Sequence, residues 1–232
     1  PQPNPKTDGL LPFMLNRLKL AQPRMQEAGH EIRFAVARGP LNIASYLMGM
    51  TEFLTTLMMQ PQAAHALVRK VTAFLTDWLT LQRETFRTID GILLLDDIIG
   101  FLGEAQFLEF LPYFKELFNV DVAVKFLHND APCLVSAPYL VDMGVNLFNM
   151  GFDVDLNELK SVTDNRVTLL GNIPPRDVLA NGTPDDVRQA TQKLIHSLHD
   201  QSRIILSCGG GMPPGVSTAN VRAFIDAVTH AA

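Results

Sequence analysis

The residues with the clearest chemical potential end a short apolar segment in the middle of the chain. Residues 122–130 read VAVKFLHND, so His128, Asn129 and Asp130 directly follow a run of β-forming residues. Such a run between polar boundaries predicts a buried strand, and polar side chains at its carboxyl end lie where α/β barrels carry out catalysis. His128 can transfer protons near neutral pH or bind a metal. Asp130 is two residues away and should point to the same side of the strand.

Two other apolar segments also end in residues that can react or bind ligands. Residues 91–97 (GILLLDD) end in Asp96 and Asp97, and residues 204–211 (IILSCGGG) contain Cys208 and three glycines. Adjacent residues on a strand face opposite sides, so only one of the two aspartates can face a site at the strand ends. Cys208 is either a ligand or a small buried apolar side chain.

Four positions near the ends of predicted strands are candidates for substrate binding: Arg38, Asn149, Asn172 and Gly210. Amide side chains can hydrogen-bond a substrate, although Asn also forms turns, and Asn172 in the sequence GNIP is suited to holding a loop. The glycine run around Gly210 allows a close backbone approach to a ligand or a positive φ.

The apolar runs alternate with stretches of helical periodicity, which predicts a parallel sheet with crossover helices. We expect six strands, at residues 32–37, 91–97, 122–127, 145–150, 167–172 and 204–208. We expect helices at residues 41–48, 54–59, 61–84, 105–117, 134–143, 156–161, 184–200 and 218–229. Thr183 should cap the helix that follows it, and a further helix from Leu10 should be interrupted near Pro23.

Composition favours one globular domain. A chain of 232 residues that is 47% hydrophobic can form a single (β/α) barrel. The net charge of −5 without a basic cluster argues against nucleic acid as a partner. No apolar run approaches the roughly 20 residues of a membrane span, and the start of the chain has no signal-peptide core, so we expect a cytoplasmic protein without a membrane partner. The two cysteines, Cys133 and Cys208, cannot form a disulfide framework.

Five segments resemble the uroporphyrinogen decarboxylase superfamily. They are GPLNIASYLMG (39–49), QPQAAHALV (60–68), GILLLDDIIGFLGEAQFLEFLPYF (91–114), LLGNIPPRDVLANGTPDDV (169–187) and SCGGGMPPGVSTANVRAFIDAV (207–228). The resemblance covers nearly the whole chain after about residue 30. It implies an α/β fold, the TIM (β/α)8 barrel, with residues 1–232 forming one domain. Six of the eight strands would lie in this chain, and the first two would precede Pro1.

The decarboxylases of this superfamily carry a tyrosine, a serine and a histidine at positions that match Met58, Asp97 and Gly210 here. All three are replaced, and the match to the serine indicates that Asp97 faces the site. A carboxylate there would repel a carboxylated tetrapyrrole. Decarboxylation of uroporphyrinogen or a related acid in porphyrin biosynthesis is therefore the alternative function.

The zinc-dependent methyltransferases of the superfamily carry His-x-Cys after the equivalent strand and a second Cys in the last loop. His128 matches the histidine, while Asp130 and Gly210 stand at the two cysteine positions. Cys208 precedes Gly210 by two residues and should face the same space, so the resemblance implies a zinc site of His128, Asp130 and Cys208.

This second branch gives the main hypothesis. A methyl group would move between a small methylated compound and a thiol or a corrinoid supplied by a partner protein, with His128, Asp97 and Asp130 as catalytic residues. A non-catalytic subunit that binds a corrinoid or tetrapyrrole is the second alternative. A homodimer is compatible with each of these functions.

Overall fold

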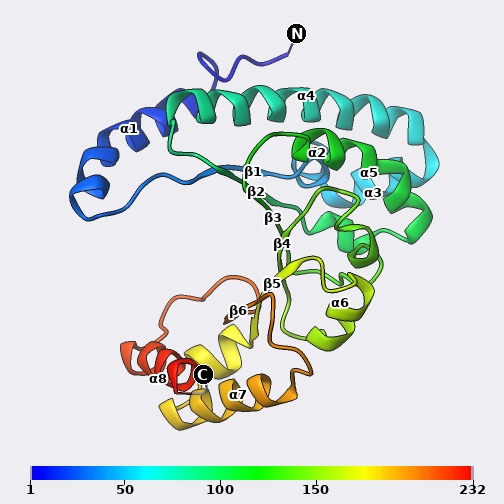
Figure 1. The fold of residues 1–232 in the computed structure, drawn as a ribbon. Helices are drawn as coiled ribbons and strands as arrows, with labels where there is room; N and C mark the ends of the chain where they lie inside the picture. Colours follow the sequence, from blue (N-terminus) through cyan, green and yellow to red (C-terminus); the bar gives the residue numbers. More distant parts are fainter. Residues whose placement is uncertain (1, 231–232) are drawn as a thin grey trace.

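The protein is built on one parallel six-stranded sheet with alternating helices. A computed structural model describes residues 2–230, and Figure 1 shows the sheet running through the middle of the molecule. The strands are β1 (Phe34–Arg38), β2 (Gly91–Leu95), β3 (Val124–Asn129), β4 (Leu147–Met150), β5 (Thr168–Ile173) and β6 (Ile204–Cys208). They are hydrogen-bonded in sequence order, as consecutive strands of a TIM barrel are. The predicted α/β fold and its six strands are confirmed.

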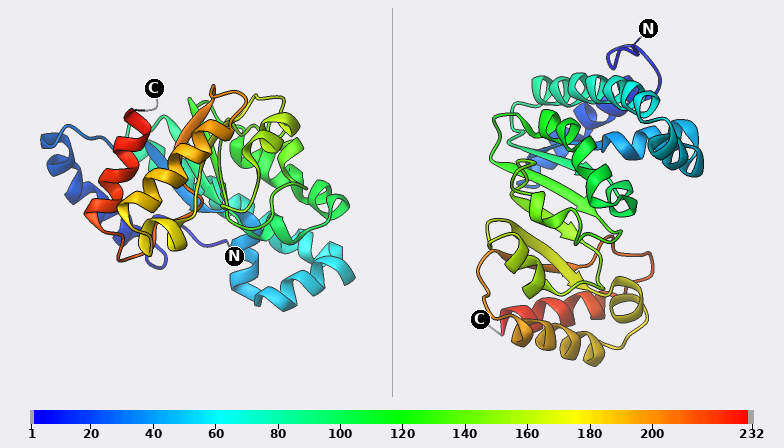
Figure 2. Two further views of the ribbon diagram at one scale, coloured as in Figure 1. Left: turned by 90° about the horizontal axis from the view of Figure 1, so that it is seen from below. Right: turned by 90° about the vertical axis from the view of Figure 1, so that its right-hand side faces the viewer.

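Helices follow most of the strands and close both ends of the sheet. They are α1 (Leu11–Glu27), α2 (Pro40–Met48), α3 (Met50–Met59), α4 (Pro61–Thr85), α5 (Glu104–Phe118), α6 (Leu156–Val162), α7 (Pro184–Ser197) and α8 (Thr218–Thr229). Figures 1 and 2 show α4 beside the edge strand β1, and α7 and α8 beside the other edge strand, β6. Within residues 2–230, no helix combines the length and the apolar character needed to cross a membrane.

Two predicted helices differ from the structure. Residues 134–143 form turns with only a short 3-10 helix, η2 (Ala137–Tyr139), because Pro138 lacks the N–H group that a longer helix needs at that point. Conversely, α1 continues through Pro23. The Pro23 nitrogen cannot donate a hydrogen bond to the carbonyl of Lys19. Because Lys19 is exposed, water can bind that carbonyl instead.

The predicted cap at Thr183 is confirmed. The Asp186 backbone N–H donates to the Thr183 hydroxyl at 3.2 Å, and the Thr183 N–H donates to the Asp186 carboxylate at 2.8 Å. This reciprocal capping box satisfies two of the free N–H groups at the start of α7.

The strand register separates two faces of the sheet. Arg38 pairs with Leu95, Leu95 with His128, His128 with Asn149, Asn149 with Leu170, and Leu170 with Ile205. Paired residues point to the same side, and we call this side the His128 face. The opposite face packs on the helices and holds the fully buried side chains of Leu94, Leu127, Phe148 and Leu169.

Leu127 tests the assignment of the two faces. Its side chain is 0% exposed on the helix-packed face, so Leu127→Ala should lower the free energy of unfolding by roughly 2–5 kcal/mol through lost burial and a residual cavity. Leu47→Ala is the matched control, because Leu47 is 67% exposed and should change stability little. Chemical denaturation of both variants measures the difference, and equal losses would contradict the assignment.

Candidate active site

The centre of the site is the ring of His128, which is held by Asn149 on the neighbouring strand. The His128 Nδ1 atom lies 2.7 Å from Asn149 Oδ1. The Asn149 side chain is oriented by its own amide group, which donates to the carbonyl oxygens of Leu170 at 2.5 Å and Cys208 at 3.4 Å. Asn149 therefore presents its carbonyl oxygen to the ring. Because that oxygen can only accept a hydrogen bond, Nδ1 must carry the proton. Nε2 is left as the nitrogen that can exchange a proton.

The Nε2 atom faces the carboxylate of Asp130. Nε2 and Asp130 Oδ2 are 3.4 Å apart, and their side chains are 14% and 46% exposed, respectively. Burial is the largest single influence on the ring and lowers the pKa of His128. The hydrogen bonds and charge from Asp130, Asn149 and Asp97 outweigh it, so the pKa of His128 lies above its usual value. Two carboxylates thus stabilise the protonated ring.

Asp97 lies at the end of β2 and contacts the end of β3. The backbone N–H of Asp130 donates to Asp97 Oδ1 at 2.8 Å. Asp97 lies two residues beyond the end of β2, and this hydrogen bond places it beside Asp130. Asp97 and Asp130 are therefore brought together with His128.

Asp96 points the other way and has a structural role that the sequence did not identify. Its carboxyl group is 0% exposed and accepts hydrogen bonds from the backbone N–H groups of Leu41, Asn42 and Ile98 at 2.9, 3.2 and 3.2 Å. Asp96 thus caps α2 from the neighbouring strand. The available signal was Gly39, which precedes α2 without a capping side chain and sits so close to Asp96 that a Cβ atom would lie 2.3 Å from Oδ2.

Gly210 provides the space that the Asp130 carboxylate occupies. Gly210 has φ +81°, and a Cβ atom added there would lie 2.4 Å from Asp130 Oδ1. A side chain at position 210 would thus compete with that carboxylate and adopt a conformation that L residues rarely take. Gly210 therefore contributes room and backbone shape to the site.

Cys208 is not brought to His128. It pairs with Ile173, three residues along from the Leu170–Ile205 pair that lies on the His128 face. Because side chains alternate along a strand, Cys208 points to the opposite face. Its side chain packs in a second apolar cluster with Ile173 and Leu179, and its Sγ donates to the Gly210 carbonyl at 3.1 Å. The prediction that Cys208 shares the space of His128 and Asp130 does not hold.

The expected zinc site lacks a third donor as a consequence. His128 and Asp130 lie together, but no group of three or more His, Cys, Asp or Glu side chains within residues 2–230 could hold a metal ion. A catalytic zinc normally needs three protein ligands. The residues present do not fit the zinc site that the resemblance implied.

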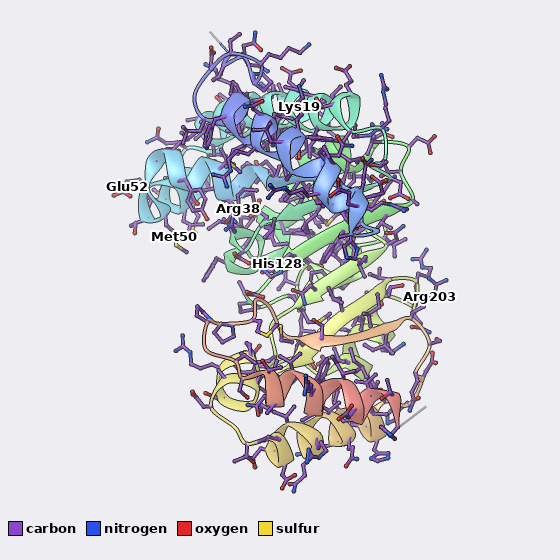
Figure 3. All side chains as sticks on the ribbon, turned by 90° about the vertical axis from the view of Figure 1, so that its left-hand side faces the viewer. Lys19, Arg38, Met50, Glu52, His128 and Arg203 are labelled. Atoms are coloured by element: carbon purple, nitrogen blue, oxygen red, sulfur yellow. The ribbon has the colours of Figure 1, made fainter. Side chains whose placement is uncertain are left out.

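Of the predicted substrate-binding residues, Arg38 is exposed, whereas Asn172 is buried and holds a loop. Arg38 is exposed on the His128 face, and within the described part of the chain it makes no salt bridge. Figure 3 shows Arg38 and His128 on the side of the sheet where the strands end, and Arg203 on the side where they begin. Asn172 is buried, and its amide donates to the carbonyl of Val154 at 2.9 Å, so it holds the loop after β4. Asn149 is likewise committed, since its amide binds the ring and two carbonyls.

The geometry is suited to proton transfer. A histidine with one nitrogen fixed by a neutral acceptor and the other facing a carboxylate can act as an acid or a base. The raised pKa of His128 favours the protonated form of the ring. The adjacent Asp97 adds negative charge beside it, which disfavours a substrate with several carboxylates.

Comparison with known proteins decides the family. A family model described as uroporphyrinogen decarboxylase (URO-D) matches residues 1–231. The chain belongs to the URO-D family. Curated URO-D relatives include uroporphyrinogen decarboxylases from Chlorobium luteolum, 28% identical over 180 residues, and Chlorobaculum tepidum, 25% identical over 240 aligned residues.

The URO-D relatives are longer than this chain. The match to the C. luteolum protein covers 73% of this chain and 49% of that protein, and the match to the C. tepidum protein covers 97% and 66%. A methyltransferase from Methanosarcina mazei has a similar structure, with a TM-score of 0.79 and 17% identity, over 96% of this chain and 65% of that one. This structural likeness supports the URO-D barrel fold alone.

Asp96 gives a prediction for stability against pH. Burial is the largest influence on its carboxyl group and raises the pKa of Asp96 from 3.8 to about 7. The folded state therefore holds this proton more tightly than the unfolded state. The stabilisation is fully present below pH 3.8 and is lost as the pH rises to about 7, with a size of order 4 kcal/mol.

The measurement is denaturation of the wild type and Asp96→Asn at several pH values. The advantage of the wild type over the variant should shrink between pH 4 and 7 and then stay constant. Asp177→Asn, at an exposed position, should keep the wild-type pH dependence. Parallel stability curves for the wild type and Asp96→Asn would rule out the raised pKa.

Proposed function

We propose that the protein transfers a methyl group from a small methylated compound to a thiol or to a corrinoid protein. The observation that carries the proposal is the His128 ring, whose Nδ1 is fixed by Asn149 and whose Nε2 faces Asp130. Methyl transfer from an oxygen, sulfur or nitrogen atom leaves a basic heteroatom that needs a proton. A partly exposed histidine with a raised pKa, such as His128, can supply one.

In the proposed step, the acceptor displaces the heteroatom directly from the methyl carbon. A lone pair of the acceptor forms a bond to the methyl carbon, while the bond between that carbon and the heteroatom breaks and its electron pair stays on the heteroatom. His128 Nε2 donates a proton to the heteroatom. With a thiol acceptor, the thiol proton restores the ring, and with a reduced corrinoid, which carries no such proton, the ring is reprotonated from water. Asp130 stabilises the protonated ring before transfer, and Asn149 keeps the donating nitrogen oriented.

Zinc is not part of this proposal, because the described residues offer no third ligand beside His128 and Asp130. A carboxylate-supported histidine replaces metal activation of the leaving heteroatom. Activity should therefore be unchanged after dialysis against a chelator, measured with metal analysis of the same sample. Loss of activity that zinc restores would contradict the proton-transfer version.

Decarboxylation of uroporphyrinogen or a related acid is the second candidate, and it is supported by the names of the curated relatives. That reaction needs a site for many substrate carboxylates. On the His128 face, Asp97 and Asp130 would repel such groups, and Arg38 is the cation that the strand register places on the same face. The charge of the site thus favours a neutral or cationic methyl donor.

The direct experiment offers the protein a methyl ether, a methyl thioether and a methylated amine. Each donor is incubated with a free thiol and, separately, with reduced cobalamin, and the methylated product is measured by mass spectrometry. Uroporphyrinogen is tested in parallel. We expect methyl transfer with at least one donor and no decarboxylation. Decarboxylation of uroporphyrinogen, or donor binding without turnover, would contradict the proposal.

His128→Ala tests the residue that carries the proposal. Removing the proton-transferring group should lower kcat by about 10²- to 10⁴-fold. The melting temperature should stay close to that of the wild type, because the ring lies at a strand end on the less buried face. Leu127→Ala is the contrasting variant, with reduced stability. A His128→Ala protein that melts well below Leu127→Ala would show that His128 is a core residue.

A further inference from the structure

We infer that Asp97 is a positioning residue that acts through Asp130, holding the Asp130 carboxylate against His128 Nε2. This inference rests on the proposed role of His128. It gives Asp97 a different task from the catalytic one suggested by the sequence. Asp97 would not touch the reacting atoms but would fix the residue that controls the proton on the ring.

The first support is the way in which the chain leaves β3. The strand ends at Asn129, and the next two backbone N–H groups are held by side chains. The Asp130 N–H donates to Asp97 Oδ1 at 2.8 Å, and the Ala131 N–H donates to Asn129 Oδ1 at 2.8 Å. The path of the backbone at Asp130 therefore depends on a carboxylate from the neighbouring strand.

The second support is the surroundings of the Asp130 carboxylate. The side chain is 46% exposed, and the interaction that the structure shows for it is the 3.4 Å ion pair with His128 Nε2. On its other side lies Gly210, where an added Cβ would be 2.4 Å from Oδ1. The contact between this carboxylate and His128 Nε2 therefore depends on where the Asp130 backbone is held.

The third support is the rigidity of Asp97 itself. The buried carboxylate of its neighbour, Asp96, accepts the Ile98 N–H at 3.2 Å and the Leu41 N–H at 2.9 Å. Asp96 thereby joins the turn after β2, which leads into the 3-10 helix η1 (Ile98–Phe101), to the start of α2. The two adjacent aspartates at the end of β2 consequently bind the start of α2 and the end of β3.

The test compares two substitutions of Asp97, of which only one keeps an oxygen that can accept the Asp130 N–H. Asp97→Asn removes the charge but keeps an oxygen that can accept the Asp130 N–H, whereas Asp97→Ala removes both. Asp130→Asn removes the carboxylate on which Asp97 would act. The set is completed by Asp97→Ala/Asp130→Asn and by Asp177→Asn, an exposed control on η3 (Pro175–Ala180).

The first readout is NMR and needs no turnover. In Asp97→Ala the amide proton of Asp130 should shift upfield and exchange faster, and the Nε2 resonance of His128 should move toward its value in Asp130→Asn. Asp97→Asn should keep the amide resonance of Asp130 near the wild type, and it should move the Nε2 resonance less than Asp97→Ala does, because only the charge is lost. Equal changes in Asp97→Asn and Asp97→Ala would overturn the inference, because charge alone would then explain the effect of Asp97.

The second readout is a double-mutant cycle on kcat, with the donor that the protein turns over. If Asp97 acts through Asp130, adding Asp97→Ala to Asp130→Asn should lower kcat little further. Multiplicative losses would contradict the inference and give Asp97 an independent role. If no donor is turned over, the proposed function fails while the NMR comparison still decides the role of Asp97.

Discussion

The arrangement of the site depends on the hydrogen bond between His128 and Asn149. Because β3 and β4 are adjacent and parallel, the register places these two residues side by side. The Asn149 amide is committed to two backbone carbonyls, so its oxygen must face the ring. This constraint assigns the proton to Nδ1 and turns Nε2 toward Asp130. The assignment of His128 as the proton-transferring group follows from it.

Around this bond, the strand ends are connected mainly by side chains. Asp97 binds the backbone that follows β3, and Asp96 binds the start of α2. Asn172 holds the loop after β4 through the carbonyl of Val154. Polar residues at the carboxyl ends of barrel strands usually serve the chemistry. In this URO-D protein, several of them instead hold backbone around the site, and Asp97 holds the backbone of Asp130 itself.

The sequence was sufficient for the strands, because apolar runs bounded by polar residues have one clear interpretation. It also placed His128 and Asp130 together, although Asp130 lies one residue beyond β3 and is held there by its backbone bond to Asp97. The expected alternation of side chains misplaced Cys208. Alternation relates Cys208 to Gly210 only within a strand, whereas β6 ends at Cys208 and the glycine loop that follows has no fixed alternation. The cap of α2 by Asp96 was also missed: Gly39 shows that α2 lacks a local capping side chain, but the residue that replaces it lies more than 50 positions away.

The most direct test of this account is the nitrogen spectrum of the His128 ring, assigned by comparison with His128→Gln. At a pH where the ring is neutral, we expect Nδ1 to show the chemical shift of a protonated nitrogen and Nε2 that of an unprotonated one. Asn149→Ala should abolish this preference. A neutral ring protonated on Nε2, or an even mixture of the two forms in the wild type, would contradict the assignment of Nε2 as the proton-exchanging atom.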